Sequence, residues 1–247
     1  QARVPGLAEG LEIRDSLQRY RDEMAFATAT QAGILPPVDA GRGVFVGRLI
    51  PSREVAGDFY DVFDLAQGRI GAVIADVSDK GVAPALFGAQ AASSLRGLAA
   101  VTESPGHLLE TLNKSLLERN PENLFITLAY FELDLSTRQV RQGNAGHETP
   151  ILLTFDTAGL LSRVEEDRSH PSLPMGLAEE GDWQTVHRSL SKHEALFLYT
   201  DGLTEMVVEK DGTMMGLEGL IALLKTFNPN NKTLVTRDNA GIETTEA

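Results

Sequence analysis

The sequence of 247 residues predicts an α+β fold whose sheets are mostly antiparallel. Short runs of β-branched and apolar residues occupy the first and last parts of the chain, and helical stretches form a block between them, as is typical of α+β proteins. Most links between successive strand-like runs are too short for the crossover that parallel strands require. The length suits one large domain, or one domain with an extension.

The N-terminal extension is predicted to be a helix over residues 9–33, ended by Pro36-Pro37. Its seam positions follow one another at alternating steps of four and three residues, as in a coiled coil. These positions are Ile13, Leu17, Tyr20, Met24, Ala27 and Gln31. This short seam ends on a polar residue, so two interpretations stay open: the helix pairs with a second copy, or it packs on its own domain.

The remaining chain divides into runs with strand and helix periodicity. Strands are predicted at Val44–Ile50, Phe59–Leu65, Arg69–Val77, Leu124–Leu133, Gln139–Asn144, Ile151–Phe155 and Ala195–Tyr199, with hairpin-like segments at Gly159–Glu165 and Gln184–Leu190. Helices are predicted at residues 83–100, residues 105–119 and Leu217–Lys225.

Composition narrows the possible functions. The formal net charge of −13 opposes nucleic-acid binding, and no Lys/Arg cluster offsets it locally. The absence of cysteine excludes disulfides, thiolate zinc sites and cysteine nucleophiles. No apolar run approaches the ~20 residues of a membrane span, and no signal-peptide pattern is present, so a cytoplasmic protein is expected.

Three aspartates follow short apolar runs at predicted strand ends: Asp58, Asp76 and Asp201. Each lies beside a glycine or a turn, where the backbone leaves room for a ligand. Taken singly, each is most simply a turn residue. Taken together, converging carboxylates repel one another unless a cation lies among them. Two divalent cations ~3.5–4 Å apart are able to activate a bridging water toward phosphorus.

Four segments, in matching order and separation, resemble the bacterial SpoIIE/RsbU branch of the metal-dependent (PPM, type 2C) serine/threonine protein phosphatases. They are Ser52–Phe63, Ala75–Leu86, Gly143–Pro150 and Leu198–Glu205. The resemblance covers residues 44 to about 220, and the helix that ends in Ile34-Leu-Pro-Pro resembles the linker helix that precedes this domain.

This resemblance implies two packed antiparallel sheets flanked by helices, an α-β-β-α sandwich. The expected domains are a linker helix at residues 1–37 and a phosphatase domain at residues 38–247. The implied reaction is hydrolysis of phosphoserine or phosphothreonine by metal-activated water, without a phosphoenzyme. Two Mn²⁺ or Mg²⁺ ions are expected, and the sequence does not choose between these metals.

The resemblance also assigns roles to particular residues. Asp76 would bridge both metals, and the Val77 carbonyl would complete one site. Asp201 would ligate from the other side, and Asp58 would bind directly or through water. Asp58, Asp76 and Asp201 are therefore the expected catalytic residues.

Four further candidates carry open alternatives. Asp61 is a supporting residue or a solvated strand residue. Asp79 stands where this branch usually has glycine, and it tunes metal affinity or points away. His147 donates a proton to the leaving serine oxygen or stabilises a turn by a hydrogen bond. Asp238 matches the family's last metal ligand poorly, so the C-terminal motif is incomplete or divergent.

The expected substrate, again by resemblance, is a phosphorylated anti-sigma-factor antagonist of the STAS type. An upstream sensor or receiver domain and a homodimer through the N-terminal helix are the other expected partners. The alternative is an adaptor that keeps the phosphatase fold, has little or no catalytic activity, and binds a regulatory partner. Retention of Asp58, Asp76 and Asp201 argues against it, and the divergent C-terminus argues for it.

Overall fold

The computed structural model describes residues 5–34, 36, 43–51, 54–167, 172–208, 212–226, 235–238 and 241–244. The chain divides into two compact units. The first comprises Gln1–Thr137, Arg141–His147 and Pro171–Val186, and the second comprises Arg138–Val140, Glu148–His170 and His187–Ala247. No helix in the described part of the chain is both long and apolar enough to cross a bilayer.

A five-stranded sheet organises the first unit, in the order β1-β2-β3-β4-β7. Its strands are β1 (Phe59–Asp64), β2 (Arg69–Val77), β3 (Ile126–Asp134), β4 (Gln139–Ala145) and β7 (Val186–Ser189), the last two of which also lend residues to the second unit. The pairs β1–β2 and β2–β3 are antiparallel. A single 3₁₀ turn (Ala66–Gly68) joins β1 to β2, so the short link forces the antiparallel pairing.

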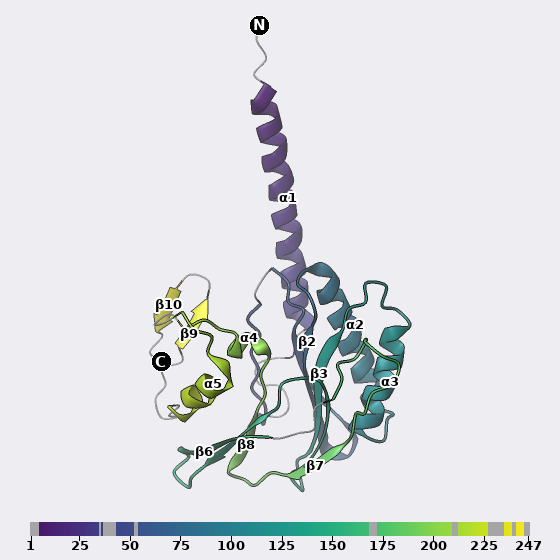
Figure 1. Ribbon diagram of the computed structural model, residues 1–247, viewed down its shortest axis with the longest axis vertical. Helices are drawn as coiled ribbons and strands as arrows, with labels where there is room; N and C mark the ends of the chain where they lie inside the picture. Colours follow the sequence, from purple (N-terminus) through teal and green to yellow (C-terminus); the bar gives the residue numbers. More distant parts are fainter. Residues whose placement is uncertain are drawn as a thin grey trace. The chain divides into compact units, whose positions relative to one another are not determined.

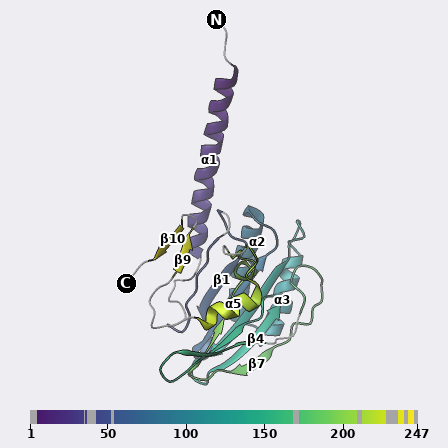
Figure 2. The same cartoon turned by 60° about the vertical axis from the view of Figure 1, so that its left-hand side comes forward.

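Two helices cover one face of this sheet, α2 (Val82–Ala99) and α3 (Pro105–Leu117), as Figures 1 and 2 show. Ser104 caps α3, and Pro105 suits its first turn because a proline there removes no helical hydrogen bond. Leucines of α3 at helical spacing are fully buried, and they pack with alternate residues of β2 and β3. Each such leucine stabilises the fold by about 1.5–3 kcal/mol relative to exposure.

The helix α1 (Pro5–Ile34) belongs to the first unit and divides its seam between two environments. The N-terminal seam residues are more than half exposed: Ile13 (57%), Leu17 (53%) and Tyr20 (53%). The C-terminal seam residues are partly buried: Met24, Ala27 and Gln31. The end of α1 therefore packs on its own domain, while its beginning leaves apolar side chains exposed.

The second unit is built on a three-stranded antiparallel sheet in the order β6-β5-β8. The strands are β5 (Ile151–Phe155), β6 (Leu161–Glu166) and β8 (Glu194–Phe197), followed by the helices α4 (Asp201–Thr204) and α5 (Gly216–Lys225). Leu220 of α5 is buried against Ile151 and Tyr199. A hairpin of β9 (Val235–Asp238) and β10 (Gly241–Thr244) completes the described elements.

The chain therefore has two antiparallel sheets and flanking helices, which confirms the predicted α+β class. The predicted bounds of β2 and β5 are those of the structure. The prediction of a strand at Val44–Ile50 is wrong, because residues 45–50 are irregular. The alternation is nevertheless present in the burial, because Val44, Val46 and Ile50 are exposed while Phe45, Gly47 and Leu49 are half-buried.

Candidate metal centre

Two of the predicted ligands, Asp58 and Asp76, lie at the ends of the paired strands β1 and β2: Asp58 directly precedes β1, and Asp76 lies in β2. The register of β1 on β2 pairs Phe59 with Ala75. Continued by one residue, the same register places Asp58 opposite Asp76. Directly opposed residues in an antiparallel pair have Cβ atoms about 4.5–5.5 Å apart, and their side chains leave the sheet on the same face.

Gly57 brings the main chain against the third predicted ligand, the Val77 carbonyl. A Cβ atom built on Gly57 would lie 3.1 Å from Val77 O and 3.4 Å from Val77 Cβ, so a side chain there would crowd the carbonyl. Gly88 of α2 allows a second close approach, since a Cβ there would lie 2.9 Å from Gly57 O. The two glycines therefore hold Asp58 beside the end of β2.

The strand alternation places Asp76 on the face of the sheet opposite the helices, and this face is called the metal face below because it carries the predicted ligand. Ala75 and Val77 join the core under α2 and α3, so Asp76, which lies between them, points to the opposite face. Thr127 of β3 pairs with Asp76 and shares that face. Asp76 of β2 and Thr127 of β3 are therefore paired, and Asp58 directly precedes the neighbouring strand β1.

His147 lies on the same side of the sheet, because its Nδ1 is 2.9 Å from Thr127 Oγ1. The side chain of Asn144 fixes its main chain: Oδ1 accepts from His147 N at 2.8 Å, and Nδ2 donates to His147 O at 3.0 Å. The imidazole is buried, with 7% of the residue exposed. These contacts describe a stabilised turn, and the proton-donor role of His147 stays a prediction.

Asp61 points away from the metal face. It is three residues beyond Asp58, so the alternation of β1 turns it toward the helices. There it is buried and accepts from Arg96 of α2, with Nε to Oδ2 at 2.9 Å and Nη2 to Oδ1 at 2.6 Å. The Arg96 guanidinium also lies 5.2 Å from the centre of the Phe63 ring. Asp61 is therefore a buried ion-pair partner, and the alternative of a solvated strand residue is wrong.

Asp201 belongs to the second unit and is the first residue of α4. The sequence placed it at a strand end, but β8 already ends at Phe197. Glu148 lies near it, since partial burial and then the charges of Asp201 and Glu166 raise the pKa of Glu148. Glu148 directly follows His147, and sequence reasoning did not single it out because an isolated glutamate carries no pattern.

The other two candidates lie elsewhere. Asp79 adopts a left-handed backbone (φ +69°), is exposed, and lines a pocket beside the start of α2. Asp238 ends β9, and its side chain lies outside the described residues. The role of Asp79 in tuning metal affinity and that of Asp238 as the last metal ligand thus stay predictions.

The donor set on the first unit suits a hard divalent cation. Two carboxylates and one carbonyl oxygen are the kind of ligands that Mg²⁺ and Mn²⁺ prefer. Across the described ranges of the chain, no three His, Cys, Asp or Glu side chains come close enough to form a complete metal-binding group. The first unit therefore supplies part of a site, and the approach of Asp201 to Asp58 and Asp76 stays a prediction.

Comparison with known proteins gives a consistent result. Residues 66–237 match the family described as Stage II sporulation protein E (SpoIIE). This match contains Asp76 and Asp201 and begins after Asp58. The phosphoserine phosphatase RsbU of Bacillus subtilis is 24% identical over 199 residues, and the alignment covers 80% of this chain and 58% of RsbU. The phosphoserine phosphatase RsbP of the same organism is 28% identical over 158 residues, covering 62% of this chain and 38% of RsbP.

Solved structures support the fold. The SiaA-PP2C domain of Pseudomonas aeruginosa superposes with a TM-score of 0.71 at 20% identity, over 85% of this chain and 83% of that domain. The phosphatase domain of SpoIIE from Bacillus subtilis gives a TM-score of 0.57 at 21% identity, over 71% of this chain and 49% of that one. The chain thus has the PP2C-type fold, and it spans little more than half of RsbU and less than half of RsbP.

Proposed function

The chain belongs to the SpoIIE family, and we propose that it is a metal-dependent phosphatase that removes phosphate from serine or threonine of a regulatory protein. The single observation that supports this proposal is the antiparallel register of β1 on β2, which continued by one residue brings Asp58 opposite Asp76, with the Val77 carbonyl beside Gly57. Two carboxylates in this position repel each other unless a cation lies between them. A fold that keeps them there is suited to cation binding.

The residues have distinct tasks in this proposal. Asp76, at the centre of the row, would contact both of two Mn²⁺ or Mg²⁺ ions, and Val77 would offer its carbonyl to one of them. Asp58 would bind directly or through water, and Asp201 would close the site from the second unit. Bound divalent ions supply a Lewis acid and an activated water for attack on phosphorus. Gly57, Gly88 and the opposed strands hold the ligands at fixed positions before any metal arrives.

The proposed substrate is a phosphorylated anti-sigma-factor antagonist of the STAS type, acted on in the cytoplasm. The support is the likeness to RsbU and RsbP, which are named phosphoserine phosphatases. The solved structure of the RsbU and RsbW domains of Rv1364c from Mycobacterium tuberculosis has a similar fold, with a TM-score of 0.54 at 24% identity over 63% of this chain and 42% of that one. An upstream sensor or receiver domain would act through α1.

We also propose that α1 pairs with its copy in a homodimer. The exposed seam residues Ile13, Leu17 and Tyr20 form an apolar stripe with coiled-coil spacing on a helix of 30 residues. The partly buried end of the same seam contacts the phosphatase domain. The beginning of α1 would pair with the second copy, while its end packs near the segment that leads into Asp58. Dimer formation would in this way be linked to that segment.

Hydrolysis of a phosphoserine protein and of p-nitrophenyl phosphate tests the proposed activity. The purified chain is assayed with Mn²⁺, with Mg²⁺ and with chelator, beside Asp76→Asn and Asp201→Asn. Metal-dependent turnover that both substitutions reduce by at least a hundredfold is expected. Absence of turnover together with absence of Mn²⁺ binding would contradict the proposal and favour the adaptor alternative.

A further inference from the structure

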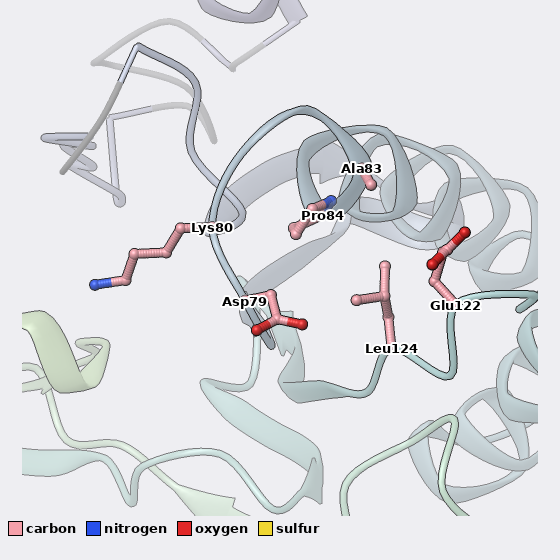
Figure 3. Close-up of a pocket in the computed structure, with 6 residues that line it drawn as sticks. All are labelled: Asp79, Lys80, Ala83, Pro84, Glu122 and Leu124. Atoms are coloured by element: carbon pink, nitrogen blue, oxygen red, sulfur yellow. The ribbon is translucent and has the colours of Figure 1, made fainter.

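A pocket of about 600 Å³ opens at the turn that follows β2, three residues after Asp76. Its lining residues are Asp79, Lys80, Ala83, Pro84, Glu122 and Leu124, which come from the turn after β2, the start of α2 and the segment before β3 (Figure 3). All of them belong to the first unit. Of its lining residues, only Asp79 was considered above, as a residue that tunes metal affinity or points away.

The chemistry of the lining is mixed. Ala83, Pro84 and Leu124 provide apolar surface, and Pro84 and Leu124 are buried. Asp79 and Glu122 are exposed carboxylates, and Figure 3 shows them on opposite sides of Leu124. Lys80 extends away from these three residues in the same view. Among the described residues, no hydrogen bond or ion pair is recorded for Asp79 or Glu122.

The apolar and acidic parts of the lining together determine which kind of ligand fits the pocket. An anion would be repelled by the two carboxylates, on a chain whose net charge is already −13. A hard metal ion needs several oxygens on one centre, and the apolar surface of Leu124 between Asp79 and Glu122 does not provide them. A lysine or arginine side chain fits both parts, because its aliphatic stem covers apolar surface while its charged head reaches carboxylates.

We propose that this pocket receives a lysine or arginine side chain of the phosphoprotein substrate, and that Asp79 and Glu122 make the enzyme selective for it. The inference rests on the proposed function, since it takes the metal face as the place where phosphate binds. Asp79 is three residues beyond Asp76, so their Cα atoms are at most about 11 Å apart. An extended peptide advances ~3.3–3.6 Å per residue, which places the basic residue within about three positions of the phosphoserine.

Asp79 is the informative position, because it lines the pocket on the turn that directly follows β2. Its left-handed backbone is the conformation that glycine tolerates best, and aspartate and asparagine tolerate it better than most residues. An aspartate at this position therefore fits the turn and places a carboxylate at the pocket. Asp79→Asn removes the charge and preserves this tolerance, so it is the matched substitution.

The test measures the binding of short peptides to the full chain in the presence of Mn²⁺. The peptides carry a non-hydrolysable phosphonate in place of phosphoserine, with arginine three positions before it, with arginine three positions after it, or with alanine at both places. One arginine peptide should bind about fivefold more tightly than the alanine peptide, as expected for two partly exposed ion pairs. The preference should shrink in 0.5 M salt because exposed charges are screened.

Substitutions decide whether the pocket is responsible. Glu122→Gln and Asp79→Asn should each reduce the arginine preference, and the double variant should abolish it. Glu110→Gln changes an exposed glutamate of α3 that does not line the pocket, and it should leave the preference unchanged. Equal or undetectable binding of all peptides, or a preference that survives the double variant, would overturn the inference. Selective binding without phosphoserine turnover would uphold the pocket while contradicting the proposed function.

Discussion

The side chain of Gln31 in α1 forms hydrogen bonds with both main-chain polar groups of Ala56, two residues before Asp58. Its Oε1 accepts from Ala56 N at 2.9 Å, and its Nε2 donates to Ala56 O at 2.7 Å. One turn earlier, Thr28 Oγ1 donates to Glu54 O. The end of α1 is therefore hydrogen-bonded to the segment that leads to Asp58, a ligand of the proposed metal site.

We expect Gln31→Ala to weaken Mn²⁺ binding and lower turnover several-fold. It removes two hydrogen bonds, each of which contributes about 0.5–1.5 kcal/mol, and it frees Ala56 from α1. Titration of Mn²⁺ into the chain, followed by calorimetry, measures the effect. Gln18→Ala is the matched control, because Gln18 donates only to Asp22 on the exposed surface of the same helix. Equal effects of the two substitutions would show that the hydrogen bonds between Gln31 and Ala56 do not influence Mn²⁺ binding.

Loss of the Arg96 side chain should destabilise the fold and leave the metal ligands in place. Arg96→Ala leaves the carboxylate of Asp61 in a buried position without its guanidinium partner, with 10% of the Asp61 side chain exposed. Because 54% of the Arg96 side chain is exposed, a cost of about 1–3 kcal/mol in the free energy of unfolding is expected. Urea denaturation measures it.

Arg163→Ala provides the control for that experiment. Arg163 pairs with Glu165, and both side chains are exposed, at 66% and 41%. Such pairs contribute about 0–1 kcal/mol. A destabilisation by Arg96→Ala no larger than that of Arg163→Ala would contradict the buried role of Asp61.

Thr127→Val should disturb the row of residues around Asp76. The valine has nearly the same shape but lacks the hydroxyl that contacts His147 Nδ1. We expect a loss of about 1–3 kcal/mol in stability and a several-fold weaker Mn²⁺ affinity, since Asp76 is the direct neighbour of Thr127 across the strands. Thr127→Ser retains the hydroxyl and should retain most of both quantities. If serine and valine behaved alike, the contact with His147 would have no part in positioning Asp76.

The beginning of α1 should carry the contact between two copies of the chain. Leu17→Glu places a charge in the exposed seam and should shift the chain to a monomeric mass in analytical ultracentrifugation. Phe26→Glu makes the same kind of change off the seam, at a side chain that is 78% exposed, and it should leave the mass unchanged. A monomer for the unaltered chain at all concentrations would contradict the homodimer proposal.

Local pattern predicted the parts of the site that lie on regular strands. The apolar run of β2, the aspartate near its end and the glycine before Asp58 can all be identified from the sequence. The side of β1 on which Asp61 lies was also predictable, because residues three apart on a strand leave opposite faces. Its partner was not, since Arg96 comes from a helix whose packing the sequence does not state.

Other features depend on which strands pair with each other, and local hydrophobic periodicity in a single sequence does not predict this pairing. The place of Thr127 beside Asp76 follows from the register of β3 on β2. The helical start at Asp201 was missed because an apolar run predicts a strand as far as Tyr199, whereas strand pairing ends at Phe197. Val44–Ile50 has the alternation of a strand, but residues 45–50 pair with no described strand.

Direct measurement of Mn²⁺ affinity for Asp76→Asn and Asp61→Asn tests the central claim most sharply. Both substitutions remove one carboxylate charge from β1 or β2, but only Asp76 lies on the proposed metal face. We predict that Asp76→Asn lowers Mn²⁺ affinity at least tenfold and abolishes phosphoserine hydrolysis, while Asp61→Asn lowers stability and keeps the affinity within about twofold. Unchanged Mn²⁺ affinity in Asp76→Asn, or an equal loss in both variants, would contradict the assignment of the metal to the Asp58–Asp76 face.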